Sequence, residues 1–339
     1  MRFSEPMALL LWCLALLVPG PTIAEPRLIK LATLAPENNN WLKALRAFDA
    51  DLRQLSDQAL GLKIYPGGVQ GDEEVMLRKL RVGQLHAVAF GGLGVSQTCP
   101  DVGALEIPFT FRSYDEVDWV LEQALPFYQR AYEQQGLVLL GWLDVGFVHI
   151  LSQQPIRSAA DARGLKVWRL EGEPITRVLF GRAGMTSVPL SIPDVLMGLQ
   201  TNLIDVVYAS PSAAIALQWF TRVRYLTALP INYTPGALLV DQRTFASLPA
   251  DQQDLLRQLA GKHLRQQRAQ NRKENGEALK VLEGAGIIIV TPAAGEIEGF
   301  GQLVQESLPD LVGKAFSQEA YDLVHALLAA YPQRPAAKP

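Results

Sequence analysis

Residues 28–33, LIKLAT, begin the stretch that decides the fold class, because apolar and β-branched side chains dominate this run. Across residues 41–55, apolar side chains recur every three or four positions, which is the period of an amphipathic helix. Residues 62–66 predict a second strand, residues 71–83 a second helix, and residues 87–90, AVAF, a third strand. This β-α-β-α-β alternation predicts an α/β fold with a largely parallel sheet.

The second half of the chain repeats the alternation. After a predicted helix over 114–135, strands are expected at residues 137–143, 147–151, 164–170, 187–188 and 204–208, and helices near 173–183 and 193–200. Neither a change in composition nor a flexible linker separates the two halves. We therefore expect two lobes joined by several crossing segments, rather than two domains in sequence.

A long helix is expected over residues 250–283, which are rich in Gln, Arg, Lys and Leu and contain no proline. At about 1.5 Å per residue it would extend for about 50 Å, longer than one lobe, so it either spans both lobes or kinks. Its charged runs, such as RQQR at residues 265–268, predict a face in contact with solvent. The Pro/Ala/Lys-rich tail over residues 334–339 is expected to be loose.

Composition argues against several classes of protein. Of the 339 residues, 49% are hydrophobic, which is enough for a sizeable core and excludes a disordered chain. The net charge of −3 comes without a clustered basic face, so we expect no nucleic-acid partner. Two cysteines and four dispersed histidines argue against a disulfide framework and a zinc site. We expect neither a metal nor a cofactor.

The N-terminus has the pattern of a secretory signal. An apolar run, ALLLWCLALLV, occupies residues 8–18, and a Pro-Gly-Pro break and small residues up to Ala24 follow it. The run is shorter than the roughly 20 residues that span a bilayer. We expect cleavage after Ala24 and export to the periplasm, where the mature chain keeps Cys99 as its one cysteine. A non-cleaved anchor or a buried N-terminal helix is the alternative.

Signatures of catalysis are missing from the sequence. It has no P-loop, no H-E-x-x-H and no G-x-S-x-G, and GGLG at residues 91–94 does not complete a dinucleotide fingerprint. His149 lies in an apolar run and Cys99 has no base placed beside it in the sequence. We therefore expect a binding protein. The alternative is a periplasmic hydrolase that uses Asp144 or Glu171, which would require a nucleophile–base pair.

Several short motifs occur in a specific order. They are YPGG at 65–68, GDEE at 71–74, LRVGQLH at 80–86, IPFTF at 107–111, PIR at 155–157, ARGLKV at 162–167, DVL at 194–196, LQTNLID at 199–205 and LPADQQ at 248–253. Together they resemble the solute-binding proteins of tripartite ATP-independent periplasmic (TRAP) transporters, the DctP-like family 7. The resemblance covers nearly all of residues 28–330.

The resemblance implies a two-lobed, periplasmic-binding-protein-like α/β fold with crossing strands and a long helix that spans both lobes. It implies a receptor, not an enzyme, which captures a small organic solute between the lobes and delivers it to the permease subunits of a TRAP transporter. Contact with the inner membrane would occur through the permease alone. A receptor without a permease, serving as a sensor or as a carrier of lipids or other apolar molecules, remains the alternative.

The resemblance also locates lobe boundaries. Lobe I is expected to comprise residues 25–148, about 235–250 and parts of the C-terminal region. Lobe II is expected to comprise residues 149–234 and other parts of the C-terminal region. Residues 1–24 form the expected signal peptide, and residues 250–283 the helix that spans both lobes.

Three positions depart from the family pattern. Where most relatives carry an arginine that binds a substrate carboxylate, this chain has Trp168, and two further polar contacts fall at Val148 and Ala209. An indole cannot replace a bidentate arginine–carboxylate pair, since it offers one N–H donor and an apolar face. The hypothesis is a solute that is not a simple dicarboxylate but more apolar, aromatic, bulky or cationic. If the register is shifted by one residue, Arg169 is the clamp instead.

Other binding residues are expected from their positions at predicted strand ends and crossing segments. The full set of candidate ligand-binding residues is Trp168, Arg169, Tyr208, Ala209, Phe147, Trp142, Gly91, Gly92, Asn39, Trp41 and Ile192. For each aromatic member, packing in the core is the alternative.

Overall fold

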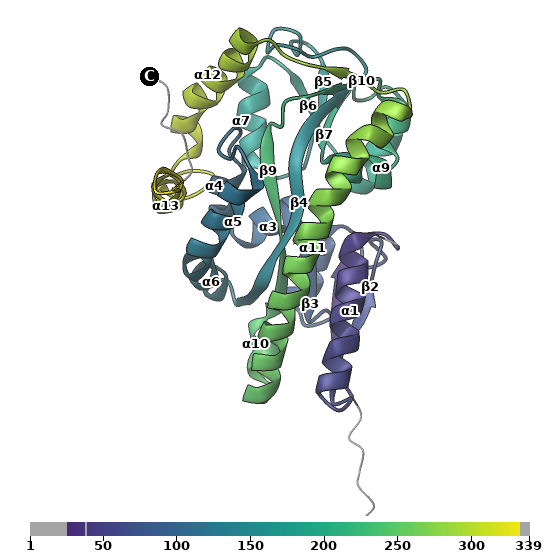
Figure 1. Ribbon diagram of the computed structural model, residues 1–339, viewed down its shortest axis with the longest axis vertical. Helices are drawn as coiled ribbons and strands as arrows, with labels where there is room; N and C mark the ends of the chain where they lie inside the picture. Colours follow the sequence, from purple (N-terminus) through teal and green to yellow (C-terminus); the bar gives the residue numbers. More distant parts are fainter. Residues whose placement is uncertain (1–25, 38, 333–339) are drawn as a thin grey trace, which may run out of the picture.

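The computed structural model describes residues 26–37 and 39–332. Its strands form one mixed sheet with the order β2-β1-β3-β9-β4-β7-β5-β6, to which β8 and β10 are joined (Figure 1). The predicted signal peptide and the predicted loose tail lie outside the described residues. The strands are β1 (Arg27–Thr33), β2 (Leu60–Tyr65), β3 (Ala87–Gly91), β4 (Leu137–Ser152), β5 (Lys166–Arg169), β6 (Thr186–Pro189), β7 (Val206–Ala209), β8 (Tyr225–Thr227), β9 (Asn232–Asp241) and β10 (Ile288–Val290).

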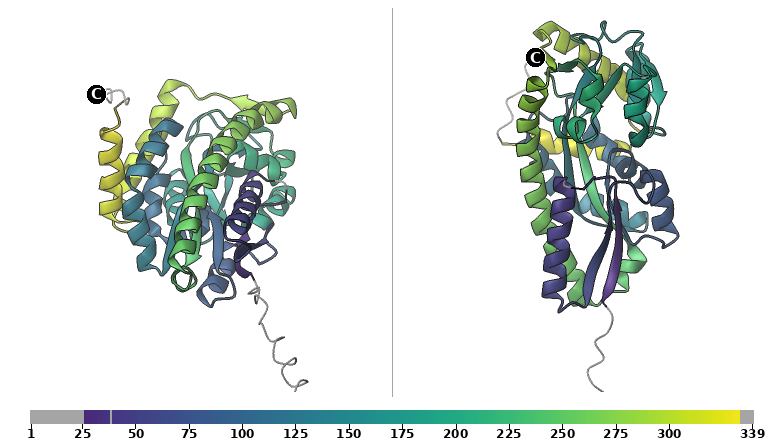
Figure 2. Two further views of the ribbon diagram at one scale, coloured as in Figure 1. Left: turned by 60° about the horizontal axis from the view of Figure 1, so that its bottom comes forward. Right: turned by 90° about the vertical axis from the view of Figure 1, so that its right-hand side faces the viewer.

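Helices cover both faces of this sheet in two lobes, as the sequence predicts (Figure 2). β1 pairs in parallel with β2 and β3 in one lobe, and β5 pairs in parallel with β6 and β7 in the other. The helices are α1 (Asn40–Leu55), α2 (Glu73–Arg81), α3 (Gly92–Thr98), α4 (Gly103–Glu106), α5 (Tyr114–Gln123), α6 (Leu125–Gln134), α7 (Pro174–Arg182), α8 (Val195–Gln200), α9 (Pro211–Ala216), α10 (Gln242–Ala246), α11 (Ala250–Gly284), α12 (Ala294–Leu311) and α13 (Gln318–Ala329).

Strand β4 crosses from one lobe to the other. It pairs antiparallel with β9 up to Val148 and then, from His149, with β7. The sequence predicted two strands here. The structure has one continuous strand, which stays paired with β9 across register shifts after Leu139 and after Asp144. The second shift lies opposite Pro235 of β9, where a residue without an N–H leaves the hydrogen-bonded ladder least disturbed.

The helix predicted over residues 114–135 is two helices. α5 ends at Gln123 and α6 begins at Leu125, with Ala124 between them. Pro126 lies in the first turn of α6, where its missing N–H is not required and its ring is tolerated. A single helix would place this proline in an interior turn, where it would remove a hydrogen bond and clash with the preceding turn.

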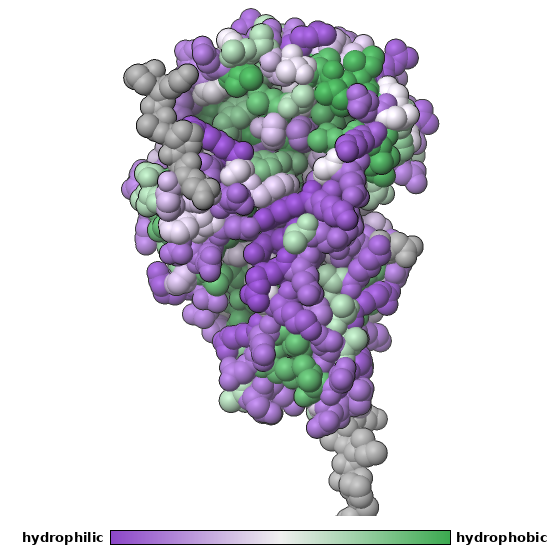
Figure 3. All heavy atoms as spheres, viewed as in Figure 1, coloured by the Kyte–Doolittle hydropathy of each residue, from purple (hydrophilic) through white to green (hydrophobic). Residues whose placement is uncertain are grey.

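The long helix α11 spans both lobes, as predicted. Its 35 residues correspond to about 50 Å, and it packs on α1, on β4 and on α9. α1 and α11 run side by side (Figures 1 and 2). The middle of α11 presents a hydrophilic outer surface (Figure 3). Of the run RQQR at residues 265–268, Arg265 and Gln266 are exposed as predicted, whereas Gln267 is buried, because four successive residues of a helix cannot all lie on one face. Among the described residues, no helix has the length and hydropathy needed to cross a membrane.

Candidate functional site

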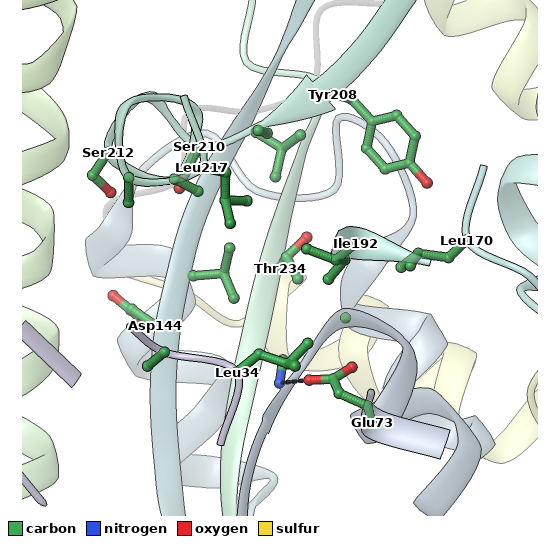
Figure 4. A pocket seen from close by; sticks show the side chains of 18 of the residues that line it. Leu34, Glu73, Asp144, Leu170, Ile192, Tyr208, Ser210, Ser212, Leu217 and Thr234 are labelled. Atoms are coloured by element: carbon green, nitrogen blue, oxygen red, sulfur yellow. Dashed lines mark hydrogen bonds between the residues drawn. The ribbon is translucent and has the colours of Figure 1, made fainter. Parts of the chain in front are cut away.

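A cavity of about 240 Å³ lies where the two lobes meet. Its walls include the ends of four strands, β1, β3, β5 and β7, and the segments that follow them (Figure 4). The carboxyl ends of parallel strands are where α/β architectures commonly bind small molecules. The crossing strands β4 and β9 also contribute to the wall, as do single residues of α2, α4 and α11.

Most residues predicted for the site line this cavity. The wall includes Trp168, Tyr208, Ala209, Gly91, Gly92, Asn39, Trp41, Ile192 and also Val148. The structure thus brings together residues that lie up to 170 positions apart in the sequence. That each of them contacts a solute stays a prediction.

Trp168 lines the wall, although other aromatic rings cover most of its side chain. Its ring stacks on that of Tyr208, with 4.8 Å between centroids and 27° between planes, and meets Trp219 edge to face. Nε1 of Trp168 donates a hydrogen bond to the carbonyl oxygen of Leu190 at 3.0 Å. Because this N–H is already paired, Trp168 can offer a ligand an apolar surface and its π electrons.

Arg169, the alternative clamp, is not among the residues that line the cavity. Its side chain instead donates from Nη1 to the carbonyl oxygen of Leu170 at 3.0 Å. The reason is the alternation of side chains along β5, which turns Arg169 away from the face that Trp168 occupies.

Trp142 and Phe147 also do not line the cavity. Trp142 is buried in the lobe that contains α6, where its ring meets Tyr128 and Tyr132. Phe147 packs on Tyr114, with 4.7 Å between ring centroids. Since neighbouring side chains of a strand face opposite sides, the position of Val148 on the wall excludes Phe147 from it.

Two acidic residues on the wall, neither of them predicted for the site, cap helices. Glu73 accepts hydrogen bonds from the backbone N–H groups of Gly91 and Gly94, both at 2.8 Å, at the start of α3. Burial raises the pKa of Glu73 from 4.5 to about 7, although these two N–H groups oppose the shift. Glu173 is the N-cap of α7 and accepts from the N–H groups of Ile175 and Thr176.

A third acidic residue, Glu106, is placed differently. It ends α4, and its hydrogen-bond partner is the side-chain hydroxyl of Thr234 rather than a backbone N–H. Burial raises the pKa of Glu106 well above its ordinary value, and the charge of Glu173 adds to the rise. Glu106 also lies on the wall of a second, mostly apolar cavity of about 120 Å³, which shares Thr176 and Tyr208 with the first.

Asp144, the fourth acidic residue, is neutralised by the protein. It is fully buried, and Nε of Arg272 donates to its Oδ2 at 2.6 Å. The hydroxyl of Tyr233 donates to its other oxygen. Burial raises the pKa of Asp144, and the Arg272 charge opposes that rise. Arg272 also forms an ion pair with Asp118 at 2.6 Å, so α11 is fastened to α5 and β4.

A stripe of buried amides on α11 supports the irregular part of β4. Gln267, Asn271 and Asn275 follow one another at intervals of four residues and therefore share one face of the helix. Asn271 and Asn275 each donate from Nδ2 to the carbonyl oxygen of Val145, at 3.2 and 3.3 Å. Gln267 accepts from the N–H of Asp144 at 3.1 Å. The interval of four was a sequence signal that could have identified these residues.

The ionisable side chains of the cavity wall are mostly of one sign. Among the described residues that line it, four are acidic (Glu73, Glu106, Asp144 and Glu173), and none is Lys, Arg or His. Of the four, Asp144 has an arginine partner. In the described part of the chain, no group of three or more His, Cys, Asp or Glu side chains is arranged to hold a metal ion.

Comparisons with known proteins agree with this architecture. The model of "Bacterial extracellular solute-binding protein, family 7", DctP, matches residues 31–314. The chain is 24% identical over 292 residues to the 2,3-diketo-L-gulonate-binding periplasmic protein YiaO of Escherichia coli, covering 84% of this chain and 86% of that protein. It is 23% identical over 279 residues to the C4-dicarboxylate-binding periplasmic protein DctP of Rhodobacter capsulatus, covering 80% and 82%.

Solved structures show the same fold. The sugar acid binding protein DctPAm of Advenella mimigardefordensis, in complex with galactonate, superimposes with a TM-score of 0.85 at 22% identity and covers 90% of this chain and 99% of that one. A TRAP periplasmic solute binding protein of Pseudomonas putida F1 with bound D-glucuronate gives 0.83 at 21% identity, covering 92% and 99%. The chain therefore belongs to family 7 of the bacterial extracellular solute-binding proteins, the DctP family of TRAP receptors, which are binding proteins and not enzymes.

Proposed function

We propose that this TRAP receptor captures, in the cavity between its lobes, a small organic solute that is more apolar, aromatic or bulky than a dicarboxylate or a sugar acid. The residues that line the cavity wall are the observation that supports this proposal. Trp168, Val148 and Ala209 occupy it, and none of its described residues is basic. A buried carboxylate requires a cation or several N–H donors to offset its lost hydration, and this wall has no cation to supply.

Two of the helix N-termini at the cavity, those of α3 and α7, are also occupied. The N-terminus of a helix is an effective site for an anion, because its N–H groups are unpaired and its dipole favours negative charge. Here Glu73 accepts from N–H groups at the start of α3, and Glu173 from those at the start of α7. At these two N-termini a ligand carboxylate would therefore meet carboxyl groups of the protein instead of free N–H donors.

The remaining elements of the proposed role follow from the family. The receptor is exported to the periplasm by the signal peptide at residues 1–24, closes its two lobes around the solute and presents the closed form to permease subunits. Ligand binding can stabilise closure only if the solute has a higher affinity for the closed state than for the open one. The lobe boundaries at residues 148/149 and about 235 remain part of this proposal.

Calorimetric titration of the purified mature chain tests the ligand class. Sodium glucuronate, galactonate and succinate are expected to give no measurable heat of binding, whereas uncharged or cationic aromatic solutes are expected to bind. In the variant Trp168→Arg, which restores an arginine at the cavity wall, binding of the acids should appear or increase. Tight binding of any of these acids by the wild-type chain would refute the proposed ligand class.

A further inference from the structure

Three carboxyl groups of the cavity wall have no cationic partner among the described residues. Glu73 and Glu173 interact with helix N-termini, which offset part of their charge. Glu106 has no such support, since its partner is the neutral hydroxyl of Thr234. Of the three groups, Glu106 is thus the one whose negative charge the protein leaves least balanced.

Aromatic side chains line the same space. Trp41, Trp168, Tyr208 and Trp219 all line the cavity. The indole N–H of Trp41 donates to the carbonyl oxygen of Asp144 at 2.9 Å, and that of Trp168 is likewise paired. With their N–H groups paired, these indoles can offer a ligand only the π-electron-rich parts of their rings that reach the cavity, and one face of Trp168 is already covered by Tyr208. Aromatic faces attract organic cations, and several of them around one site form the type of cage that binds quaternary ammonium groups.

A buried polar atom on the wall also lacks a partner. Ser210 is fully buried and lines the cavity beside Ala209 (Figure 4). Within the described part of the chain its Oγ atom has no hydrogen-bond partner. Leaving a buried hydroxyl unpaired is costly, so a polar group of the ligand is the natural partner for Ser210.

We propose that the cavity binds an organic ammonium ion, with the Glu106 carboxylate as its counter-ion, the side chains of Trp168 and Tyr208 against its apolar part, and the Ser210 hydroxyl as a hydrogen-bond partner. The inference rests on the proposed function, because it specifies the ligand class of the same cavity. It goes further in assigning a positive charge to the ligand and a recognition role to Glu106. Asp144 takes no part, since Arg272 already neutralises it.

The test compares probes that differ in charge but match in shape. The mature wild-type chain is titrated calorimetrically with choline, benzyltrimethylammonium and 2-phenylethylamine, with 3,3-dimethylbutan-1-ol as the uncharged isostere of choline, and with sodium glucuronate. At least one ammonium probe is expected to bind, and choline at least about tenfold more tightly than its isostere, as expected for one added charge-assisted contact. Glu106→Gln should weaken ammonium binding by at least about tenfold. Glu122→Gln, at an exposed position of α5, should leave it unchanged.

Proton release provides a second measurement that does not depend on a variant. An ammonium ion stabilises the ionised carboxyl, so its binding should lower the raised pKa of Glu106 and release protons near neutral pH. Titrations in phosphate and in Tris, whose ionisation enthalpies differ, should therefore give different heats for the ammonium probes and equal heats for an uncharged ligand. The charges of Glu73 and Glu173 act on Glu106. The phenols of Tyr128, Tyr132 and Tyr208 are also coupled to it, but burial raises the pKa of each above its ordinary value of 10, so they stay protonated near neutral pH.

The outcomes separate the two proposals. If 3,3-dimethylbutan-1-ol binds as tightly as choline and Glu106→Gln binds both like the wild type, the positive charge is refuted while an apolar solute remains supported. Failure of all three ammonium probes to bind refutes the positive charge as well. Binding of glucuronate by the wild type overturns the proposed ligand class itself. If Glu106→Gln does not fold, equal heats of ammonium binding in both buffers decide against the inference.

Discussion

Nε of Arg272 on α11 lies 2.6 Å from Oδ2 of Asp144 on the crossing strand β4. Asp144 is fully buried, and Arg272 lies over the ring of Tyr114. This pair joins the helix that spans both lobes to the strand that connects them, at the level of the cavity. Its geometry leads to a first prediction about stability.

Replacement of Arg272 should destabilise the fold strongly. Arg272→Met would leave the Asp144 carboxylate buried without a cation, a change that typically costs about 3–5 kcal/mol. Urea unfolding at neutral pH measures the loss. Arg265→Met, at an exposed position of the same helix, should change stability by less than about 0.5 kcal/mol. Equal effects of the two substitutions would show that the Arg272–Asp144 pair is not important for stability.

Glu73 should make stability fall as the pH rises. Its pKa is about 7 in the folded chain against an ordinary value of 4.5, so the folded state binds this proton more tightly than the unfolded state. The resulting stabilisation, up to about 3 kcal/mol, is complete below about pH 4.5 and is lost as the pH rises through about 7. In Glu73→Gln this dependence is absent.

Unfolding free energies at pH 5 and pH 8 test this prediction. The stability of Glu73→Gln relative to the wild type should increase between the two values, by about 2–3 kcal/mol. Glu74→Gln, at the exposed neighbouring position, should keep the pH dependence of the wild type. Parallel pH profiles for Glu73→Gln and the wild type would contradict the raised pKa.

Truncation of Trp168 should destabilise the lobe in which it lies. The ring is 3% exposed and packs on Tyr208 and Trp219, so Trp168→Ala would leave a large hole and cost about 3–5 kcal/mol. Trp168→Phe, which keeps an aromatic ring in the stack, should cost clearly less. Thermal unfolding of both variants measures the difference. Similar melting temperatures for the two would mean that the stack with Tyr208 contributes little.

Asn275 should stabilise the contact between α11 and both lobes. Its Oδ1 accepts from the N–H and hydroxyl of Ser212 at 3.0 and 2.6 Å, and its Nδ2 donates to the carbonyl oxygen of Val145. Asn275→Leu would leave the N–H and the hydroxyl of Ser212 without their acceptor, whereas the carbonyl oxygen of Val145 would keep Asn271 as a donor; the expected cost is about 1–3 kcal/mol. The control is Gln266→Leu on the exposed side of the helix, expected to be near neutral. Urea midpoints that do not differ would refute this role.

The sequence alone determined the fold class, the long helix over residues 250–283 and the departure at Trp168. These follow from local signals: hydrophobic periodicity, turn residues and the position of one side chain relative to a motif. The prediction of one helix over residues 114–135 was wrong, because the chain forms two helices and Pro126 lies in the first turn of the second. The sequence of β9, with Pro235 and Gly236 in its centre, contains no clear strand signal. Its pairing with β3 and β4 is a long-range contact that no local pattern indicates.

Only the tertiary structure decided which side chains face the cavity. Alternation along β4 and β5 turns Phe147 and Arg169 away, and burial against Tyr128 and Tyr132 places Trp142 in the core. The acidic character of the cavity wall could not be predicted from the sequence either. Glu73 lies in a motif that predicts only a helix start, and Glu106 and Glu173 are separated from it by tens of residues. A local pattern specifies an element and its faces, whereas a cavity is formed by elements that are distant in the chain, so its charge emerges only when they are packed together.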